Sequence, residues 1–119
     1  MSDYASASDL PGHAERGMSA PPEVVFNTAT DPARAGWLPE PLRQGQRPQL
    51  TTETLCARWD SESGEVTWMA QLQVRPIDAG GAQVRLDLAV DPPEPRLDEL
   101  ASESLDGLAR QVADNLTAG

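Results

Sequence analysis

Residues 66–90 read VTWMAQLQVRPIDAGGAQVRLDLAV, and this stretch carries the clearest structural pattern in the chain. Apolar residues occupy every second position in 66–74 and again in 82–90. Successive side chains of a strand point to opposite faces, so this alternation predicts two strands with one apolar and one polar face. The segment 78–81, which ends in two glycines, is typical of a turn. The stretch therefore predicts an antiparallel hairpin.

A third run of the same period lies before this hairpin, in residues 55–59 (LCARW). The segment 61–64 joins it to the hairpin and has the small and polar residues of a turn. Three consecutive runs of this kind predict a meander with one face buried. The prolines within 92–95 end the sheet.

Beyond the prolines, residues 97–116 carry apolar side chains at helical spacing. The stripe consists of Leu97, Leu100, Ala101, Leu105, Leu108, Ala109, Val112 and Leu116. Asp98 and Glu99 fall in the first turn, where the helix dipole favours acidic groups. An amphipathic helix must bury its stripe, and the apolar sheet face is the available partner. We expect an α+β fold with this long helix packed on an antiparallel sheet, and the alanines of the stripe predict a close approach.

The N-terminal third predicts shorter elements. Residues 1–12 are small and polar and predict a flexible tail, followed by one domain over 13–119. Within that domain, residues 13–20 predict a first strand and 22–29 a short helix that starts at a proline. Asp31 is expected to cap a second short helix that begins at the next proline. Further prolines predict irregular backbone from 39 to 48.

Composition narrows the class of partner and the compartment. The formal net charge is −10 and all nine basic residues are arginines, scattered singly, so neither nucleic acid nor an anionic membrane surface is expected as partner. No apolar run approaches the roughly 18 residues of a membrane span, and no secretory signal is recognised. Cys56 is the only cysteine, so no internal disulfide can form. We expect a cytoplasmic protein, of bacterial origin because exclusive use of arginine suggests a GC-rich genome.

Four segments carry a family resemblance: APPEVVFNTATDP at 20–32, WLP at 37–39, the hairpin with its preceding residue at 67–90, and LDGLARQVADNL at 105–116. In residue pattern and in order along the chain they resemble START-like domains of the polyketide cyclase/dehydrase type, the SRPBCC superfamily. The resemblance implies a helix-grip fold with a cavity between sheet and long helix. Members bind lipids, sterols, polyketides or other apolar molecules, and some cyclise or dehydrate them. This chain has room for fewer than the usual six or seven strands.

The resemblance suggests which large side chains would line such a cavity. The candidates are Phe26, Trp37, Trp59, Trp68, Leu105 and Leu108. The same residues also suit the packed core of a small domain, because large aromatic side chains carry much of its burial. Both interpretations place them on the apolar side of the sheet.

Catalytic groups are scarce. His13 is the only histidine and lies beside the expected tail, while Cys56 falls on the polar face or at an edge of its strand. A general base or thiolate needs a cleft and an activating partner, so neither is expected to react. We assign no catalytic residue, metal site or cofactor. The first hypothesis is therefore a binding protein for an apolar small molecule. The alternatives are an aromatase/cyclase-type enzyme on a polyketide-like substrate, and a protein-interaction or homodimerisation domain with a shallow apolar groove.

Overall fold

The computed structural model describes residues 12–43, 48–78, 80–92 and 94–118. Five strands form one antiparallel sheet in the order β1-β5-β4-β3-β2. The elements in chain order are β1 (Gly12–Met18), α1 (Pro22–Thr30), the 3-10 helices η1 (Pro32–Trp37) and η2 (Glu40–Leu42), β2 (Gln49–Thr51), β3 (Cys56–Ser63), β4 (Val66–Pro76), β5 (Ala82–Asp91) and α2 (Leu97–Ala118).

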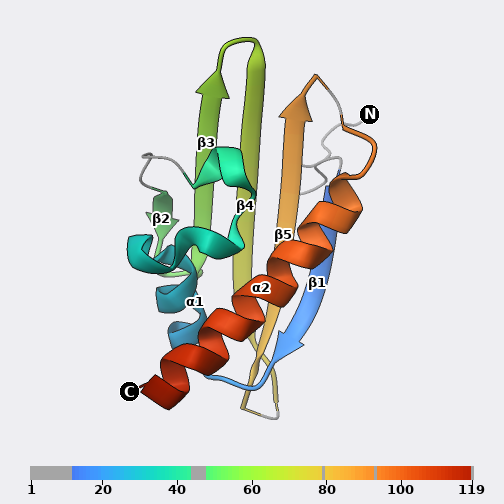
Figure 1. Ribbon diagram of the computed structural model, residues 1–119. Helices are drawn as coiled ribbons and strands as arrows, with labels where there is room; N and C mark the ends of the chain where they lie inside the picture. The colour runs from blue at the N-terminus through green and yellow to red at the C-terminus, as the bar shows by residue number, and fades with distance from the viewer. Residues whose placement is uncertain (1–11, 44–47, 79, 93, 119) are drawn as a thin grey trace.

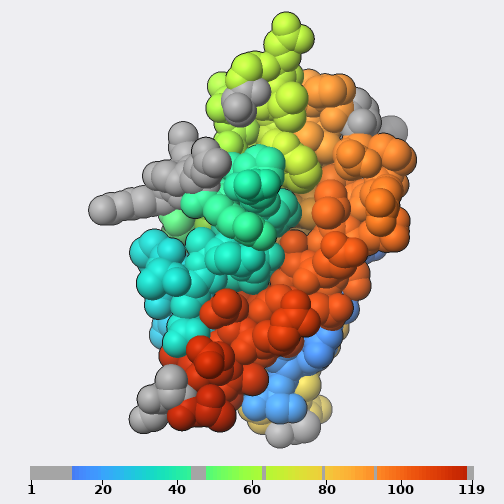
Figure 2. Space-filling view, in the orientation of Figure 1, coloured from blue at the N-terminus to red at the C-terminus, as the bar shows by residue number. Residues whose placement is uncertain are grey.

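All helices lie on one face of this sheet (Figure 1). The long helix α2 crosses it diagonally and packs on β1 and β5, while α1 and η2 pack on the strands beside them, including β4. Figure 2 shows that α2 meets the shorter helices on this face, and that the β3–β4 hairpin extends beyond them. The predicted α+β architecture with a terminal helix on an antiparallel sheet is confirmed.

The predicted meander is present as β3, β4 and β5. The turn predicted at 61–64 was placed too early, because residues 61–63 pair with β4 as the end of β3 and the chain reverses at 64–65. Leu72 lies opposite both Ala57 of β3 and Leu86 of β5, so the apolar positions of three strands share one face. All three of these side chains are buried. The period-two pattern predicted these strands well because each is long enough to show several alternations.

The two short helices follow from their first residues. Helix α1 begins at Pro22, carries an acidic residue in its first turn, and buries Val25 and Phe26 as predicted. Asp31 accepts a hydrogen bond from the backbone N–H of Ala33 at 2.9 Å and so caps η1, although that segment is a 3-10 helix. Within the described residues of the proline-rich segment, the backbone is irregular apart from η2.

The first strand begins one residue earlier than predicted. Gly12, assigned by sequence to the tail, is a buried residue of β1, and a Cβ built on it would lie 2.3 Å from the Cβ of Leu97. The start of α2 therefore rests directly on the strand, and a glycine permits that approach. The rest of the predicted tail lies outside the described residues.

The apolar stripe of α2 is buried or partly buried except at its last turn. Leu97, Leu105 and Leu108 are buried, but Leu116 is 50% exposed. The expectation that Leu116 is buried was wrong because the last turn of α2 passes beyond the strands (Figure 1). None of the described helices is long and apolar enough to cross a membrane.

Candidate functional site

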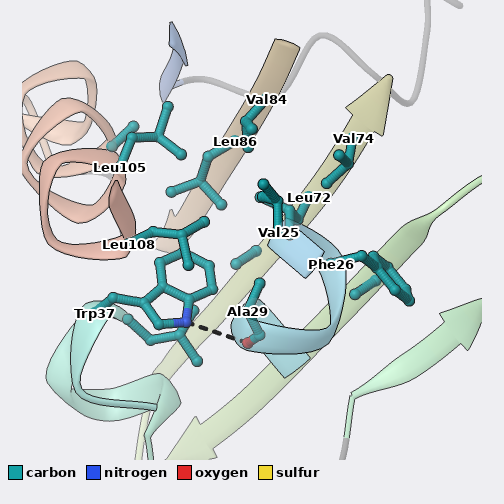
Figure 3. Close-up of a cluster of buried hydrophobic side chains, with 14 of the residues drawn as sticks. Val25, Phe26, Ala29, Trp37, Leu72, Val74, Val84, Leu86, Leu105 and Leu108 are labelled. Atoms are coloured by element: carbon teal, nitrogen blue, oxygen red, sulfur yellow. Dashed lines mark hydrogen bonds between the residues drawn. The ribbon is translucent and has the colours of Figure 1, made fainter. Parts of the chain in front are cut away.

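The space between the middle of α2 and the sheet is filled by side chains. Leu105 and Leu108 are 1% and 0% exposed, and they lie toward Leu86 and Trp37 (Figure 3). Ala101, one turn earlier on the helix, is also fully buried. The small residue lets helix and sheet approach closely, as the sequence predicted, and the leucines occupy the remaining room.

Trp37, the last residue of η1, contacts both helix α1 and strand β3. Its indole N–H donates a hydrogen bond to the carbonyl oxygen of Ala29 at 3.1 Å, drawn in Figure 3. Its ring meets that of Trp59 edge to face, with centroids 5.6 Å apart and planes at 84°. The hydrogen bond and the ring contact fix the indole in one orientation.

A pocket of about 530 Å³, which we call the lateral pocket, lies beside Trp59. It opens between the short helices and the edge formed by β2 and β3. Its described lining consists of Ala29, Thr30, Asp31, Pro32, Ala35, Leu38, Leu42, Arg43, Pro48, Leu50 and Trp59. The volume falls within the range of small-molecule sites, and the lining is mostly apolar with a few polar groups, as such sites usually are.

All three polar residues of the lateral pocket hold local hydrogen bonds. The hydroxyl of Thr30 donates to the carbonyl oxygen of Phe26 at 2.9 Å, and Asp31 caps η1. Arg43 uses only its Nε, which donates to the carbonyl oxygen of Leu38 at 2.6 Å. The terminal nitrogens of that guanidinium make no ion pair or hydrogen bond within the described part of the chain.

A second pocket of about 370 Å³, the upper pocket, lies between the N-terminal half of α2 and the η1–η2 segment. Trp68 of β4 and Ser104 and Gly107 of α2 border it, together with charged residues of both walls. Leu38 and Arg43 border both pockets. The upper pocket is smaller, more open and more polar than the lateral pocket.

Of the six predicted cavity residues, three border a pocket and three do not. Trp59 lines the lateral pocket, whereas Trp37 and Trp68 line the upper one. The other three, Phe26, Leu105 and Leu108, are buried in the core and border neither pocket.

The sequence missed the residues that form most of the lateral pocket. Leu38, Leu42 and Leu50 come from a proline-rich segment and from a strand of three residues, which are too irregular to show a period. The available signal was the single apolar Leu50 among polar neighbours, which is 49% exposed. Arg43 had no distinguishing sequence context.

The reactive residues lie apart from both pockets. His13 is exposed, and its backbone N–H donates to a carboxylate oxygen of Asp98 at 2.9 Å. The thiol of Cys56 is half-buried on β3, 3.7 Å from the carbonyl oxygen of Thr54. Among the described residues, no three potential metal ligands cluster.

Comparison with known proteins finds likeness in structure alone. No protein-family model and no curated sequence matches the chain. The protein TTHA0849 from Thermus thermophilus superimposes with a TM-score of 0.61 at 18% identity, over 87% of this chain and 97% of that one. The protein CV1439 from Chromobacterium violaceum gives 0.58 at 20% identity, over 84% and 94%.

A norcoclaurine synthase point mutant from Thalictrum flavum, solved with a transition-state analogue, gives a TM-score of 0.60 at 11% identity, over 87% of this chain and 93% of that one. This synthase has the helix-grip fold of the START/SRPBCC superfamily. The five-stranded sheet and terminal helix described above agree with that fold. Identities this low show the fold and leave activity to be argued from the chain's own residues.

Proposed function

We propose that this protein binds an apolar small molecule, and that the lateral pocket holds it. The observation that carries the proposal is the location of open space. The region under the middle of α2 is packed, while about 530 Å³ remains beside Trp59 and Leu42. Burial of apolar surface against such walls is favourable by roughly 25 cal/mol per Å².

Likeness of fold adds support of a general kind. Helix-grip proteins of the superfamily that this chain resembles bind hydrophobic ligands. In this chain the ligand's place shifts sideways, from between the sheet and α2 to between the short helices and the β2–β3 edge. The shift has a physical cause, because Trp37, Leu105 and Leu108 fill the central position.

The test is a titration with Nile red, a neutral apolar dye whose fluorescence rises in apolar surroundings. We expect saturable binding to the wild-type protein. Ala35 borders the lateral pocket and Ala33 is exposed on the same 3-10 helix, so Ala35→Phe and Ala33→Phe form a matched pair. Ala35→Phe fills the pocket and should weaken binding at least about tenfold, the loss of roughly 1.4 kcal/mol.

Ala33→Phe should bind the dye as the wild type does, with circular dichroism checking that both variants fold. Equal affinity in the two variants would place the dye elsewhere and contradict the proposal. Absence of saturable binding to the wild type would contradict it as well. Native mass spectrometry of the purified protein gives an independent reading of any copurified ligand.

One observation favours a second candidate, homodimerisation. Strand β2 is a short edge strand, and Leu50 on it is 49% exposed beside the mouth of the lateral pocket. Exposed edges and apolar side chains are sites of pairing between chains. Light scattering during size-exclusion chromatography measures the oligomeric state. A dimer that the substitution Leu50→Glu dissociates would favour this candidate, and a monomeric wild-type protein would oppose it. The cyclase-type alternative has no comparable support from the residues that line the pocket.

A further inference from the structure

We propose that the ligand of the lateral pocket is an amphipathic anion, and that the guanidinium of Arg43 binds its carboxylate at the mouth. This inference rests on the proposed function, because it names the chemical class of molecule that occupies the same pocket. Three observations carry it: the orientation of Arg43, its lack of an acidic partner among the described residues, and the apolar walls behind it.

The orientation of Arg43 comes from a single hydrogen bond. Its Nε donates to the carbonyl oxygen of Leu38 at 2.6 Å, a residue that itself lines the pocket. This contact positions the guanidinium at the pocket, and its terminal nitrogens make no hydrogen bond within the described residues. A guanidinium presents paired donors that match the two oxygens of a carboxylate.

Arg43 is one of three described arginines, with Arg75 and Arg110, that form no ion pair within the described residues. The net charge is −10, and five other arginines form ion pairs within the described residues. These arginines are Arg16, Arg34, Arg58, Arg85 and Arg96. Arg43 forms none there, although Glu40 lies in the preceding turn. An arginine that pairs with none of the described carboxylates is available to an external anion.

Apolar walls decide which anion fits. Leu38, Leu42, Leu50 and Trp59 line the space behind the guanidinium. A small hydrated anion would gain nothing from these walls. A molecule with a hydrocarbon body and a terminal carboxylate uses both the charge and the apolar surface.

Asp31 also lines the pocket and opposes an anion there. One of its oxygens accepts the N–H of Ala33, so part of its charge is already compensated by the backbone. A cationic amphiphile would use Asp31 in place of Arg43. The two possibilities differ in the sign of the ligand's charge. Ligands that share one chain length but differ in the charge of the head group distinguish them.

The experiment measures dissociation constants by calorimetry for decanoate, decanol and decylammonium, which share a hydrocarbon chain and differ in head group. We expect decanoate to bind most tightly to the wild type. Arg43→Gln should weaken decanoate about five- to tenfold, within the range of charge-assisted hydrogen bonds at a partly exposed site. The same variant should leave decanol unchanged.

Arg75→Gln is the matched control, because Arg75 is exposed, forms no ion pair within the described residues, and does not line the pocket. It removes the same charge and should leave all three affinities unchanged. Arg43→Lys keeps the charge without the paired donors and should bind decanoate with intermediate affinity.

The outcomes separate the two proposals. If decanol and Nile red bind but decanoate shows no preference, or loses affinity equally in Arg43→Gln and Arg75→Gln, the role of Arg43 is wrong and the pocket stands. If decylammonium binds most tightly and Asp31→Asn weakens it, the ligand has the opposite sign. If neither the neutral nor the charged ligands bind, the pocket itself is not a binding site.

Discussion

The two sides of the layer between helices and sheet differ in how closely they are packed. On one side, which we call the closed half, α2 rests on β1 and β5, with Ala101 buried and Gly12 in contact range of Leu97. On the other, the open half, α1 and the 3-10 helices stand beside β3 and β2 around the lateral pocket. The same sheet therefore supports a filled interface and an unfilled one.

The difference follows from the helices. A regular helix of 22 residues repeats its small and large side chains, so they can interdigitate with the strands along its length. The short helices of the open half are interrupted by Pro32, Pro39 and Pro41 and cannot form such a repeat. In this protein the regular helix therefore packs tightly on the sheet, whereas the irregular helices leave a pocket beside it. We expect the closed half to carry stability and the open half to carry binding.

The largest effect is expected from Leu108→Ala in the closed half. Leu108 is fully buried, and truncation of such a leucine costs about 2–5 kcal/mol, because the cavity left behind cannot collapse completely. The control is Leu50→Ala in the open half, which should cost less than about 1 kcal/mol because that side chain is half exposed. Urea unfolding measures both. Equal losses would show that the halves do not differ in stability.

Gly12→Ala should destabilise the closed half by about 1–3 kcal/mol. The added methyl would meet Leu97, so α2 or β1 must shift. Gly36→Ala is the counterpart in the open half, since a Cβ there meets nothing within 4 Å. It should be neutral or slightly stabilising, because alanine restricts the unfolded chain. Thermal unfolding of both variants checks the contrast. A loss of stability in Gly36→Ala as large as that in Gly12→Ala would contradict it.

Trp37→Phe tests the boundary between the halves and should cost about 1–2 kcal/mol. The variant removes the indole N–H donated to Ala29 and reduces the edge-to-face contact with Trp59. Chemical denaturation gives the loss. We also expect larger neutral dyes to bind more tightly, because the smaller ring leaves space next to Trp59, which lines the lateral pocket. A loss of stability without a change in dye binding would argue against this role of Trp37.

The smallest effect concerns the exposed start of α2. The side chain of Arg96 donates a hydrogen bond to Glu99 at 3.0 Å, and this bond, together with the positive charge, lowers the pKa of Glu99. A lowered carboxyl pKa contributes stability above its unfolded value, and that contribution is lost as pH falls through the folded value. Nuclear magnetic resonance titration of the Glu99 carboxyl should give a midpoint below the ordinary one. In Arg96→Gln the midpoint should rise, and an unchanged midpoint would contradict the pairing.

The sequence predicted the closed half better than the open half. The strands around Leu72 and Leu86 repeat every second residue, and α2 begins at Leu97 as its spacing predicted. Long periodic segments report their buried face directly, because burial is what selects the repeat. In this half the sequence missed only the ends of two elements. Gly12 belongs to β1, and Leu116 at the end of α2 is exposed.

The lateral pocket could not be predicted in this way. It joins Leu42 and Leu50, from segments without a period, to Trp59 of a regular strand. Space between elements depends on how far apart their backbones stand, which no single segment encodes. Trp59 was identified because it lies in an alternating strand, but what stands opposite to it is set by tertiary structure.

The position of β1 at one edge of the sheet also determines when the protein can complete its structure during synthesis. Within the described sheet β1 pairs only with β5, and the amide of His13 is bound by Asp98, 85 residues later. Contacts between such distant segments form slowly, because a long loop must close first. Strand β1 leaves the ribosome before β5 and therefore waits for its partner. Until β5 arrives, its unpaired backbone groups are open to pairing with a neighbouring nascent chain.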